Sequence, residues 1–190
     1  MELTPLDVRI IDTPYPICVD LDNTLIQGDL TQMAFWRLVK NPLHWPRIIM
    51  RVIKGGRPAL KAYLALHVPL QISNLKFNTK LIEFLKKQHQ KGSEIFLVTG
   101  SPKVYADIIA SHLMVFKEVW ASTHSLNLVG KKKAQLLTQK FGYLAYTYIG
   151  DSKKDFYVWE QARCIFAVNP THSIECRIRK LSKNFVLWRE

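Results

Sequence analysis

Residues 15–25 have the sequence YPICVDLDNTL, in which a short apolar run ends at two carboxylates that bracket one leucine. The run 15–20 predicts a buried β-strand, because the strands of parallel sheets are continuous apolar stretches. Asp20 and Asp22 follow where such a strand enters a loop, and two residues one position apart can face the same side. The stretch therefore predicts a strand with two acidic side chains at its carboxyl end.

The chain beyond residue 79 alternates helical and strand patterns. We expect helices over 79–90, 102–112, 131–141 and 152–161, and strands over 94–99, 117–121, 146–150, 164–168 and 184–188. Strands that alternate with helices imply right-handed crossovers and a parallel sheet covered on both faces. The sequence therefore predicts an α/β fold, a three-layer Rossmann-like parallel sheet.

Residues 30–78 interrupt this alternation after the first strand. They predict helices over 31–40, from about residue 46 to the Gly55-Gly56 pair, and from Pro58 to residue 66. We expect residues 30–78 to form a small helical cap over the carboxyl edge of the sheet. Residues 1–29 and 79–190 would form the core domain.

The charge of the chain is concentrated in this cap. The net charge is +12, and residues 30–82 contain no acidic residue. Such a segment attracts anions such as phosphorylated substrates or acidic lipids, although a solvated basic face is the simpler interpretation. The cap also contains Phe35, Trp36, Trp45 and Tyr63, which suit an anionic substrate with an apolar part or an anionic membrane. We expect most of these aromatic side chains to pack the cap onto the core.

The first 16 residues, MELTPLDVRIIDTPYP, carry acids where a signal peptide carries bases. No apolar stretch reaches the roughly 18 residues that a membrane-spanning helix needs. We therefore expect a cytoplasmic protein whose only membrane contact would be peripheral, through the basic cap.

Several polar residues fall at the carboxyl ends of the expected strands, where open α/β sheets bind ligands. The second strand ends at Thr99-Gly100-Ser101, and the fourth ends at Gly150-Asp151 with Asp155 four residues on. Three lysines at 131–133 begin a helix between them. Clustered carboxylates repel one another unless a cation compensates them. Oxygen ligands favour Mg²⁺, and the histidines lack the spacing of a zinc site.

Two carboxylates in such a pocket can divide the work of phosphoryl transfer. One attacks phosphorus, and the other protonates the leaving oxygen and then deprotonates water. The hydroxyl of Thr99 and the backbone amides near Asn23 and Gly100 can position the phosphoryl group.

The four segments ICVDLDNTLI, IFLVTGS, GKKKAQLL and YIGDSKKD resemble the four motifs of the haloacid dehalogenase (HAD) superfamily, over roughly residues 15–170. The resemblance implies a HAD-like phosphatase with Asp20 as nucleophile and Asp22 as acid/base. It also implies Thr99 and Lys133 as phosphate ligands, with Lys131 and Lys132 adjacent. The resemblance further implies that Mg²⁺ is held by the side chains of Asp20 and Asp151 and by the backbone carbonyl of Asp22, with Asp155 supporting these ligands.

Two longer stretches, PICVDLDNTLIQGDL and WASTHSLNLVGKKKAQLL, resemble the HAD domain found fused ahead of UbiA-type polyprenyl transferases. That resemblance implies a polyprenyl-linked phosphate as substrate. Asp22 favours phosphoryl chemistry over dehalogenation, since a departing halide needs no acid. The alternative is a catalytically weak module that binds a membrane or a partner through the basic cap. We expect a small phosphorylated substrate and no nucleic acid, because no nucleic-acid motif is present.

Overall fold

The computed structural model describes residues 14–181 and 183–189 and contains a six-stranded sheet of order β3-β2-β1-β4-β5-β6. All strand pairs are parallel. The strands are β1 (Ile17–Val19), β2 (Ile95–Pro102), β3 (Glu118–Ser122), β4 (Thr147–Gly150), β5 (Cys164–Val168) and β6 (Asn184–Trp188). The strand order reverses between β1 and β4, and ligands bind at such a switch point in open α/β sheets.

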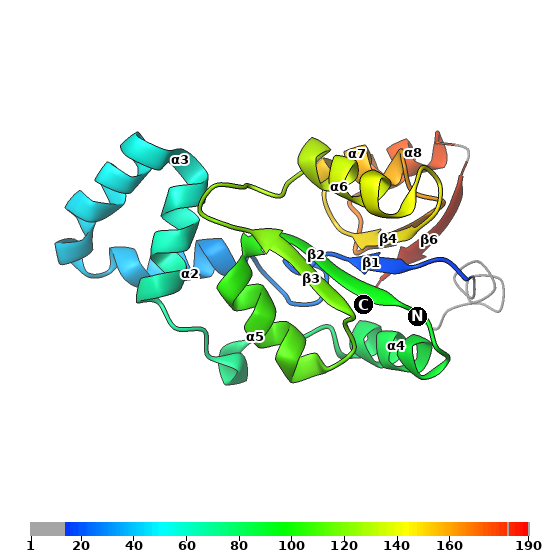
Figure 1. Ribbon diagram of the computed structural model, residues 1–190, viewed down its shortest axis with the longest axis horizontal. Coiled ribbons are helices and arrows are strands. Elements are labelled where there is room, and N and C mark those ends of the chain that lie inside the picture. The colour runs from blue at the N-terminus through cyan, green and yellow to red at the C-terminus, as the bar shows by residue number, and fades with distance from the viewer. Residues whose placement is uncertain (1–13, 182, 190) are drawn as a thin grey trace.

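Helices cover both faces of this sheet (Figure 1). One face packs against α4 (Thr79–Gln90) and α5 (Lys103–Leu113), and the other against α6 (Lys131–Phe141), α7 (Phe156–Trp159) and α8 (His172–Arg179). Within β1, Ile17 and Val19 belong to the hydrophobic cluster on the side of α4 and α5. Cys18 belongs to the cluster on the side of α6, α7 and α8. The predicted three-layer parallel α/β fold is confirmed.

The segment after β1 is helical, as predicted, and lies beyond the carboxyl ends of β1 and β2 (Figure 1). It contains α2 (Leu30–Val39), the 3₁₀ turns η1 (Pro42–His44) and η2 (Ile72–Asn74), and α3 (Trp45–His67). The chain leaves and re-enters the core side by side, because the amide of Gln27 donates to Lys76 at 2.8 Å and the amide of Asn78 to Leu25 at 2.9 Å. The boundaries of core and cap remain a prediction.

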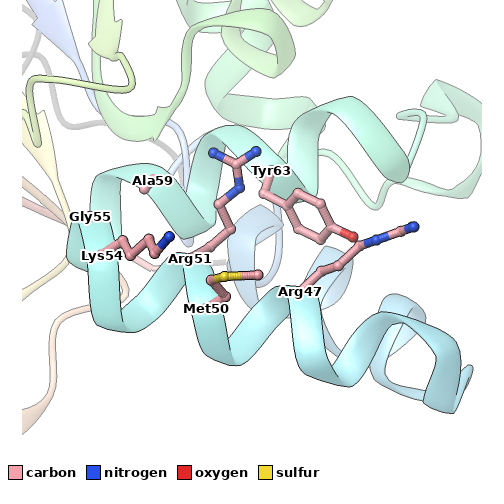
Figure 2. Close-up of a pocket in the computed structure, with 7 residues that line it drawn as sticks. All are labelled: Arg47, Met50, Arg51, Lys54, Gly55, Ala59 and Tyr63. Carbon is pink, nitrogen blue, oxygen red and sulfur yellow. The ribbon is translucent and has the colours of Figure 1, made fainter.

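Helix α3 turns sharply at Gly56, whose φ of 61° and ψ of −154° are not helical. A positive φ is inexpensive only for glycine, so the predicted break falls where the backbone requires this residue. The second half of α3 folds back toward the first, and Met50 and Tyr63 from the two halves line one cavity (Figure 2).

Two predicted elements differ from the structure, and one helix of the structure was not predicted. Strand β1 is shorter than 15–20, and Asp20 lies just past its end. The predicted helix 152–161 is instead the 3₁₀ turn η3 (Lys153–Asp155) followed by the short α7, because Asp155 folds back to form a capping box with Ser152. Helix α8 was missed, since its eight residues bury only Ile174 and Ile178.

The aromatic residues of the cap divide into two groups. Tyr63 is buried, and Phe35 packs against the hydrophobic cluster that includes residues of α4 and α5, as expected. Trp36 and Trp45 are 59% and 52% exposed, so two of the four aromatic side chains pack as expected, and the expectation for most of them is wrong.

The described helices include none that combines the length and apolar character needed to cross a bilayer. The expectation of no signal peptide rested on the first 16 residues, and residues 1–13 lie outside the described part of the chain.

Candidate active site

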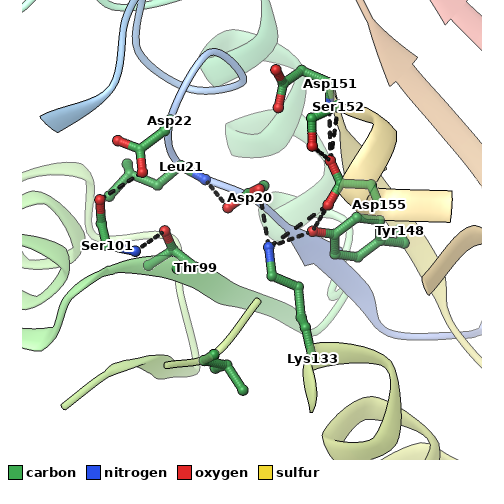
Figure 3. Close-up of polar contacts among 12 residues, drawn as sticks. Asp20, Leu21, Asp22, Thr99, Ser101, Lys133, Tyr148, Asp151, Ser152 and Asp155 are labelled. Atoms are coloured by element: carbon green, nitrogen blue, oxygen red, sulfur yellow. Dashed lines mark hydrogen bonds and ion pairs between the residues drawn. The ribbon is translucent and has the colours of Figure 1, made fainter. Parts of the chain in front are cut away.

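Asp20 lies at the carboxyl end of β1, the strand between β2 and β4, and is only 9% exposed. Its amide donates to the carbonyl of Ile149 in β4 at 2.9 Å, which fixes the backbone. Its Oδ1 accepts the amide of Leu21 at 2.8 Å, and its Oδ2 lies 2.9 Å from Nζ of Lys133 (Figure 3). The carboxylate is therefore held by one amide and one ammonium group.

Lys133 is the only one of the three adjacent lysines that is buried, since Lys131 and Lys132 are exposed. Besides pairing with Asp20, Nζ of Lys133 donates to the hydroxyl of Tyr148 at 2.7 Å and lies 3.8 Å from Asp155. Burial lowers the pKa of Lys133, but the two carboxylates outweigh burial and the net pKa is raised. The ammonium charge is thus secured by its acidic neighbours.

Asp155 is buried and accepts hydrogen bonds at both carboxylate oxygens. Its Oδ2 accepts the amides of Asp151 at 3.3 Å and Ser152 at 2.9 Å and the Ser152 hydroxyl at 2.8 Å, and its Oδ1 accepts Tyr148 at 2.9 Å. Gly150 permits this approach, since a Cβ there would lie 2.9 Å from the Asp155 carboxylate. Asp155 therefore fixes the loop that carries Asp151.

Carboxylate oxygens of Asp20, Asp151 and Asp155 lie within 4.8 Å of one another. Burial raises the pKa of Asp20, and burial with repulsion from Asp20 raises the pKa of Asp151 to about 8. The Asp151 carboxylate makes no hydrogen bond or ion pair with the part of the chain that the structure describes (Figure 3). A hard divalent cation would relieve this repulsion, so the oxygen-rich donor set fits Mg²⁺.

The side chain of Asp22 lies apart from this carboxylate cluster. Its Oδ1 accepts the amide of Leu30 at 2.8 Å, and its Oδ2 accepts the hydroxyl of Ser101 at 2.5 Å. Burial raises the pKa of the Asp22 carboxyl to about 7, against the opposing effect of these two hydrogen bonds. Asp22 is thus positioned by the first residue of α2 and by the end of β2.

The expected phosphate-binding residues differ in how they meet the site. Asn23, Gly100 and Lys133 line the same small cavity as Asp20 and Asp22. Thr99 is fully buried, lies outside the lining of that cavity, and its Oγ1 accepts the amide of Ser101 at 3.0 Å. The structure therefore brings most of the predicted set together and places Thr99 behind it.

Lys61 of α3 reaches from the helical segment into the site. Its Nζ donates to the carbonyl of Gly100 at 2.5 Å and to Oδ1 of Asn127 at 2.9 Å. Burial lowers the pKa of Lys61, while the charges of Asp22 and Asp29 oppose this effect. Lys61 therefore adds a cation to the lining of the small cavity, besides Lys133 and Lys154.

A larger cavity of about 570 Å³ adjoins the site and shares Asp29, Thr31, Lys61, Val129 and Lys154 with it. Its remaining lining includes the apolar side chains of Phe35, Leu60 and Leu64 and the guanidinium of Arg57. The space beyond the carboxylates is therefore partly apolar and partly cationic.

Sequence reasoning assigned no role in the site to four residues that the structure places there. Ser101 and Tyr148 carry a weak signal, because each lies on a site-bearing strand, one residue from Gly100 and three residues from Asp151 respectively. Ser152 begins a short polar turn, and its residue type favours a helix-capping position without indicating a part in the site. Lys61 carries no such signal, since only the folded chain brings it to Gly100, 39 positions along the sequence.

The fold and the site define an α/β protein with a carboxylate-lysine centre at the carboxyl edge of a parallel sheet. The chain belongs to the haloacid dehalogenase-like hydrolase family, whose model matches residues 17–160.

Comparison with known proteins gives one curated relative and several similar structures. The chain is 33% identical over 180 residues to the uncharacterized protein y4nM of Sinorhizobium fredii, which covers 94% of this chain. The chain spans only 34% of the length of that relative.

A HAD family hydrolase of Salmonella enterica serovar Typhi has a TM-score of 0.64 at 14% identity and covers 97% of this chain and 77% of its own. A substrate-bound phosphoserine phosphatase has a TM-score of 0.61 at 15% identity, with coverages of 92% and 93%. At these identities the two structures show the fold alone.

Proposed function

We propose that this chain is a magnesium-dependent phosphomonoester hydrolase in which Asp20 is the nucleophile. The observation that carries the proposal is the pairing of the Asp20 carboxylate with Lys133 at 2.9 Å, beside a cluster of carboxylates in one small cavity. Phosphoryl transfer depends mainly on positioning and charge neutralisation, and these groups supply both.

In the first step, a carboxylate oxygen of Asp20 attacks phosphorus and the bond from phosphorus to the leaving oxygen breaks. The protonated Asp22 carboxyl gives its proton to that oxygen, so that a neutral alcohol departs. Asp20 then carries the phosphoryl group as an aspartyl-phosphate. The hydrogen bonds from Leu30 and Ser101 hold Asp22 in place for this transfer.

In the second step, the Asp22 carboxylate removes a proton from water, and the water oxygen attacks phosphorus. The bond between phosphorus and Asp20 breaks, which releases inorganic phosphate and restores both carboxyl groups. Lys133, Asn23 and the backbone amide of Gly100 would bind the phosphoryl oxygens throughout, and Thr99 would order the end of β2 that carries Gly100 and Ser101.

Asp20, Asp151 and the backbone carbonyl of Asp22 would hold Mg²⁺, and Asp155 would support them. The bound ion would supply neutralisation of the negative charge shared by the phosphoryl group and the carboxylates. Both carboxylate oxygens of Asp155 accept hydrogen bonds, whereas the carboxylate of Asp151 has no partner among the described residues. This difference supports the division of roles.

The finer proposal for the substrate is a phosphorylated molecule that is partly apolar. The adjoining cavity supports it, because Arg57, Lys61 and Lys154 attract anionic groups and Phe35, Leu60 and Leu64 accept an apolar part. Residues 30–78 would act as the specificity cap and residues 1–29 and 79–190 as the core. The resemblance to the domains fused to UbiA-type transferases favours a polyprenyl-linked phosphate.

The test compares wild type and Asp20→Asn on an aryl phosphate with Mg²⁺. We expect the variant to lose roughly 10⁴-fold or more in turnover, because the amide of asparagine is a far weaker nucleophile than the carboxylate that pairs with Lys133. Equal, slow phosphate release by both proteins would contradict the catalytic proposal.

The metal assignment has a separate test that does not need turnover. Added Mg²⁺ should raise the melting temperature of wild type, because a ligand that binds only the folded state stabilises it. Asp151→Asn should reduce this increase. Asp107→Asn is the matched control, because Asp107 is exposed on α5 and pairs only with Lys103 among the described residues.

A further inference from the structure

The first half of α3, residues 45–55, is a helix that is exposed almost all round. Ile48 is its only buried residue. In Figure 1 this half forms the outer edge of the helical segment, away from the sheet. Isolated helices of about 12 residues are marginal in water, so a helix with so few tertiary contacts gains stability from a surface that covers it.

One face of this half is apolar and open to solvent. Trp45, Ile49, Val52 and Ile53 are 52%, 58%, 46% and 77% exposed. They follow the spacing i, i+4, i+7 and i+8, which places them on one stripe of a helix. The indole of Trp45 is fixed at the end of this apolar stripe, because its Nε1 donates to the carbonyl of Val39 at 2.9 Å.

The opposite face of the same half is cationic. Arg47, Arg51 and Lys54 line a cavity of about 500 Å³ with Met50 and Tyr63 (Figure 2). The guanidinium of Arg51 lies 5.8 Å from the centre of the Tyr63 ring. None of the ion pairs between described residues involves these three cations. Their charge is therefore not neutralised within the described chain.

We propose that the first half of α3 docks on a membrane surface that carries anionic lipids. The apolar stripe of Trp45, Ile49, Val52 and Ile53 inserts at the boundary between headgroups and acyl chains. Arg47, Arg51 and Lys54 extend along the polar side and attract the anionic headgroups. A helix with apolar residues on one face and Lys and Arg on the other lies in the plane of the interface in this way.

Charge favours a membrane over a protein partner. Residues 30–82 contain no carboxylate that an anionic surface would repel. This half combines three cations with the four exposed side chains of the apolar stripe over 11 residues, which is the composition of a helix that lies in an anionic interface. The docking half is separate from Asp20 and its partners, so this inference does not depend on the proposed catalysis.

The first experiment measures co-sedimentation of the full chain with vesicles of phosphatidylcholine, with and without phosphatidylglycerol. Wild type should bind the anionic vesicles at least about 10-fold more strongly, because each cation near the surface adds to the attraction. Ile49→Ser/Ile53→Ser should weaken this binding about 10-fold or more. Val104→Ser/Ile108→Ser is the matched control, because these residues are exposed at the same i, i+4 spacing on α5, and it should bind like wild type.

The second experiment tests the cationic face. Arg47→Gln/Arg51→Gln/Lys54→Gln should weaken binding to the anionic vesicles about 100-fold, since each basic residue near an anionic surface contributes roughly fivefold. Lys80→Gln/Lys86→Gln/Lys87→Gln removes the same charge from exposed positions of α4 and should have a much smaller effect.

Insertion of the apolar stripe can be observed directly. A polarity-sensitive dye on Ile53→Cys, in a Cys176→Ser background that removes the exposed thiol, should shift to shorter wavelength with anionic vesicles. The same dye on Val104→Cys should not shift.

Two results would overturn the proposal. Equal losses in the α3 and α4 charge variants would show adsorption by net charge alone. A dimer in solution that Ile49→Ser/Ile53→Ser dissociates, without vesicle binding by wild type, would assign the apolar stripe to a second copy of the chain.

Discussion

Two regions of this molecule carry positive charge, and they differ in whether carboxylates pair with the cations. At the sheet edge, Lys133 is 2% exposed, contacts Asp20 and Tyr148, and lies near Asp155. On the first half of α3, Arg47, Arg51 and Lys54 lie at an open cavity without any carboxylate partner among the described residues. The first region pairs its buried lysine with carboxylates, and the second leaves its cations available.

This difference follows from burial. A buried charge must be paired and hydrogen-bonded, because its removal from water costs several kcal/mol of free energy, whereas an exposed charge stays hydrated. The pairing also fixes the geometry of Asp20, which chemistry needs. An exposed cation needs no partner and can interact with any anionic surface. The same residue types therefore serve positioning in one region and attraction in the other.

The largest expected effect that tests this comparison is on stability. Lys133→Met should lower the free energy of unfolding by about 3–5 kcal/mol without Mg²⁺, because it leaves two buried carboxylates without their cation. Urea denaturation measures the loss. Lys132→Met is the control, because this neighbour is exposed, and its effect should stay within about 0.5 kcal/mol. Similar losses in both variants would contradict the pairing argument.

The next effect concerns Asp22, the carboxyl group held by Ser101 and Leu30. Asp22→Asn should reduce turnover of an alkyl phosphate by about 10²–10⁴-fold, because an alkoxide leaves poorly without a proton. The loss should be much smaller for a nitrophenyl phosphate, whose leaving group needs no acid. A plot of kcat/KM against the pKa of the leaving group measures the difference. Equal losses across the series would exclude the acid role.

The sequence predicted the parallel sheet and its carboxyl edge because both depend on local patterns. Apolar runs that end in Asp20, Thr99 and Gly150 mark three strand ends, and parallel strands bring such ends to one edge. Lys133 also follows from sequence, but only through the resemblance of its segment to a known motif. Its burial beside Asp20 distinguishes it from Lys131 and Lys132, which local patterns alone could not do.

Contacts between distant segments could not be predicted. Lys61 meets Gly100 only because the two halves of α3 fold back at Gly56 and bring the second half over the sheet edge. The exposure of Trp45 was also unpredictable, since an apolar residue at helical spacing is usually part of the core. Long-range packing decides both positions.

Lys61 provides an intermediate case between the two regions, because it is partly buried and bonds only neutral oxygens. If it binds an anionic part of the substrate, Lys61→Met should raise KM about 10-fold, since one hydrogen bond to a charged group contributes about 1.5–3 kcal/mol. The value of kcat should change less. Lys40→Met, which removes an exposed charge from the same segment, is the control. A fall in kcat with unchanged KM would instead assign Lys61 to the chemical step.

The smallest expected effect completes the comparison. Arg47→Gln/Arg51→Gln/Lys54→Gln removes three charges, yet the free energy of unfolding should change by no more than about 0.5 kcal/mol, because no described ion pair is broken. Among the described residues, the cation–π contact of Arg51 with Tyr63 is the only ring contact that these cations lose, and relief of repulsion between the cations offsets it. Urea denaturation of this triple variant and of Lys133→Met measures the two changes in the free energy of unfolding. A loss comparable to that of Lys133→Met would show that these cations stabilise the fold and are not simply available to bind an anionic surface.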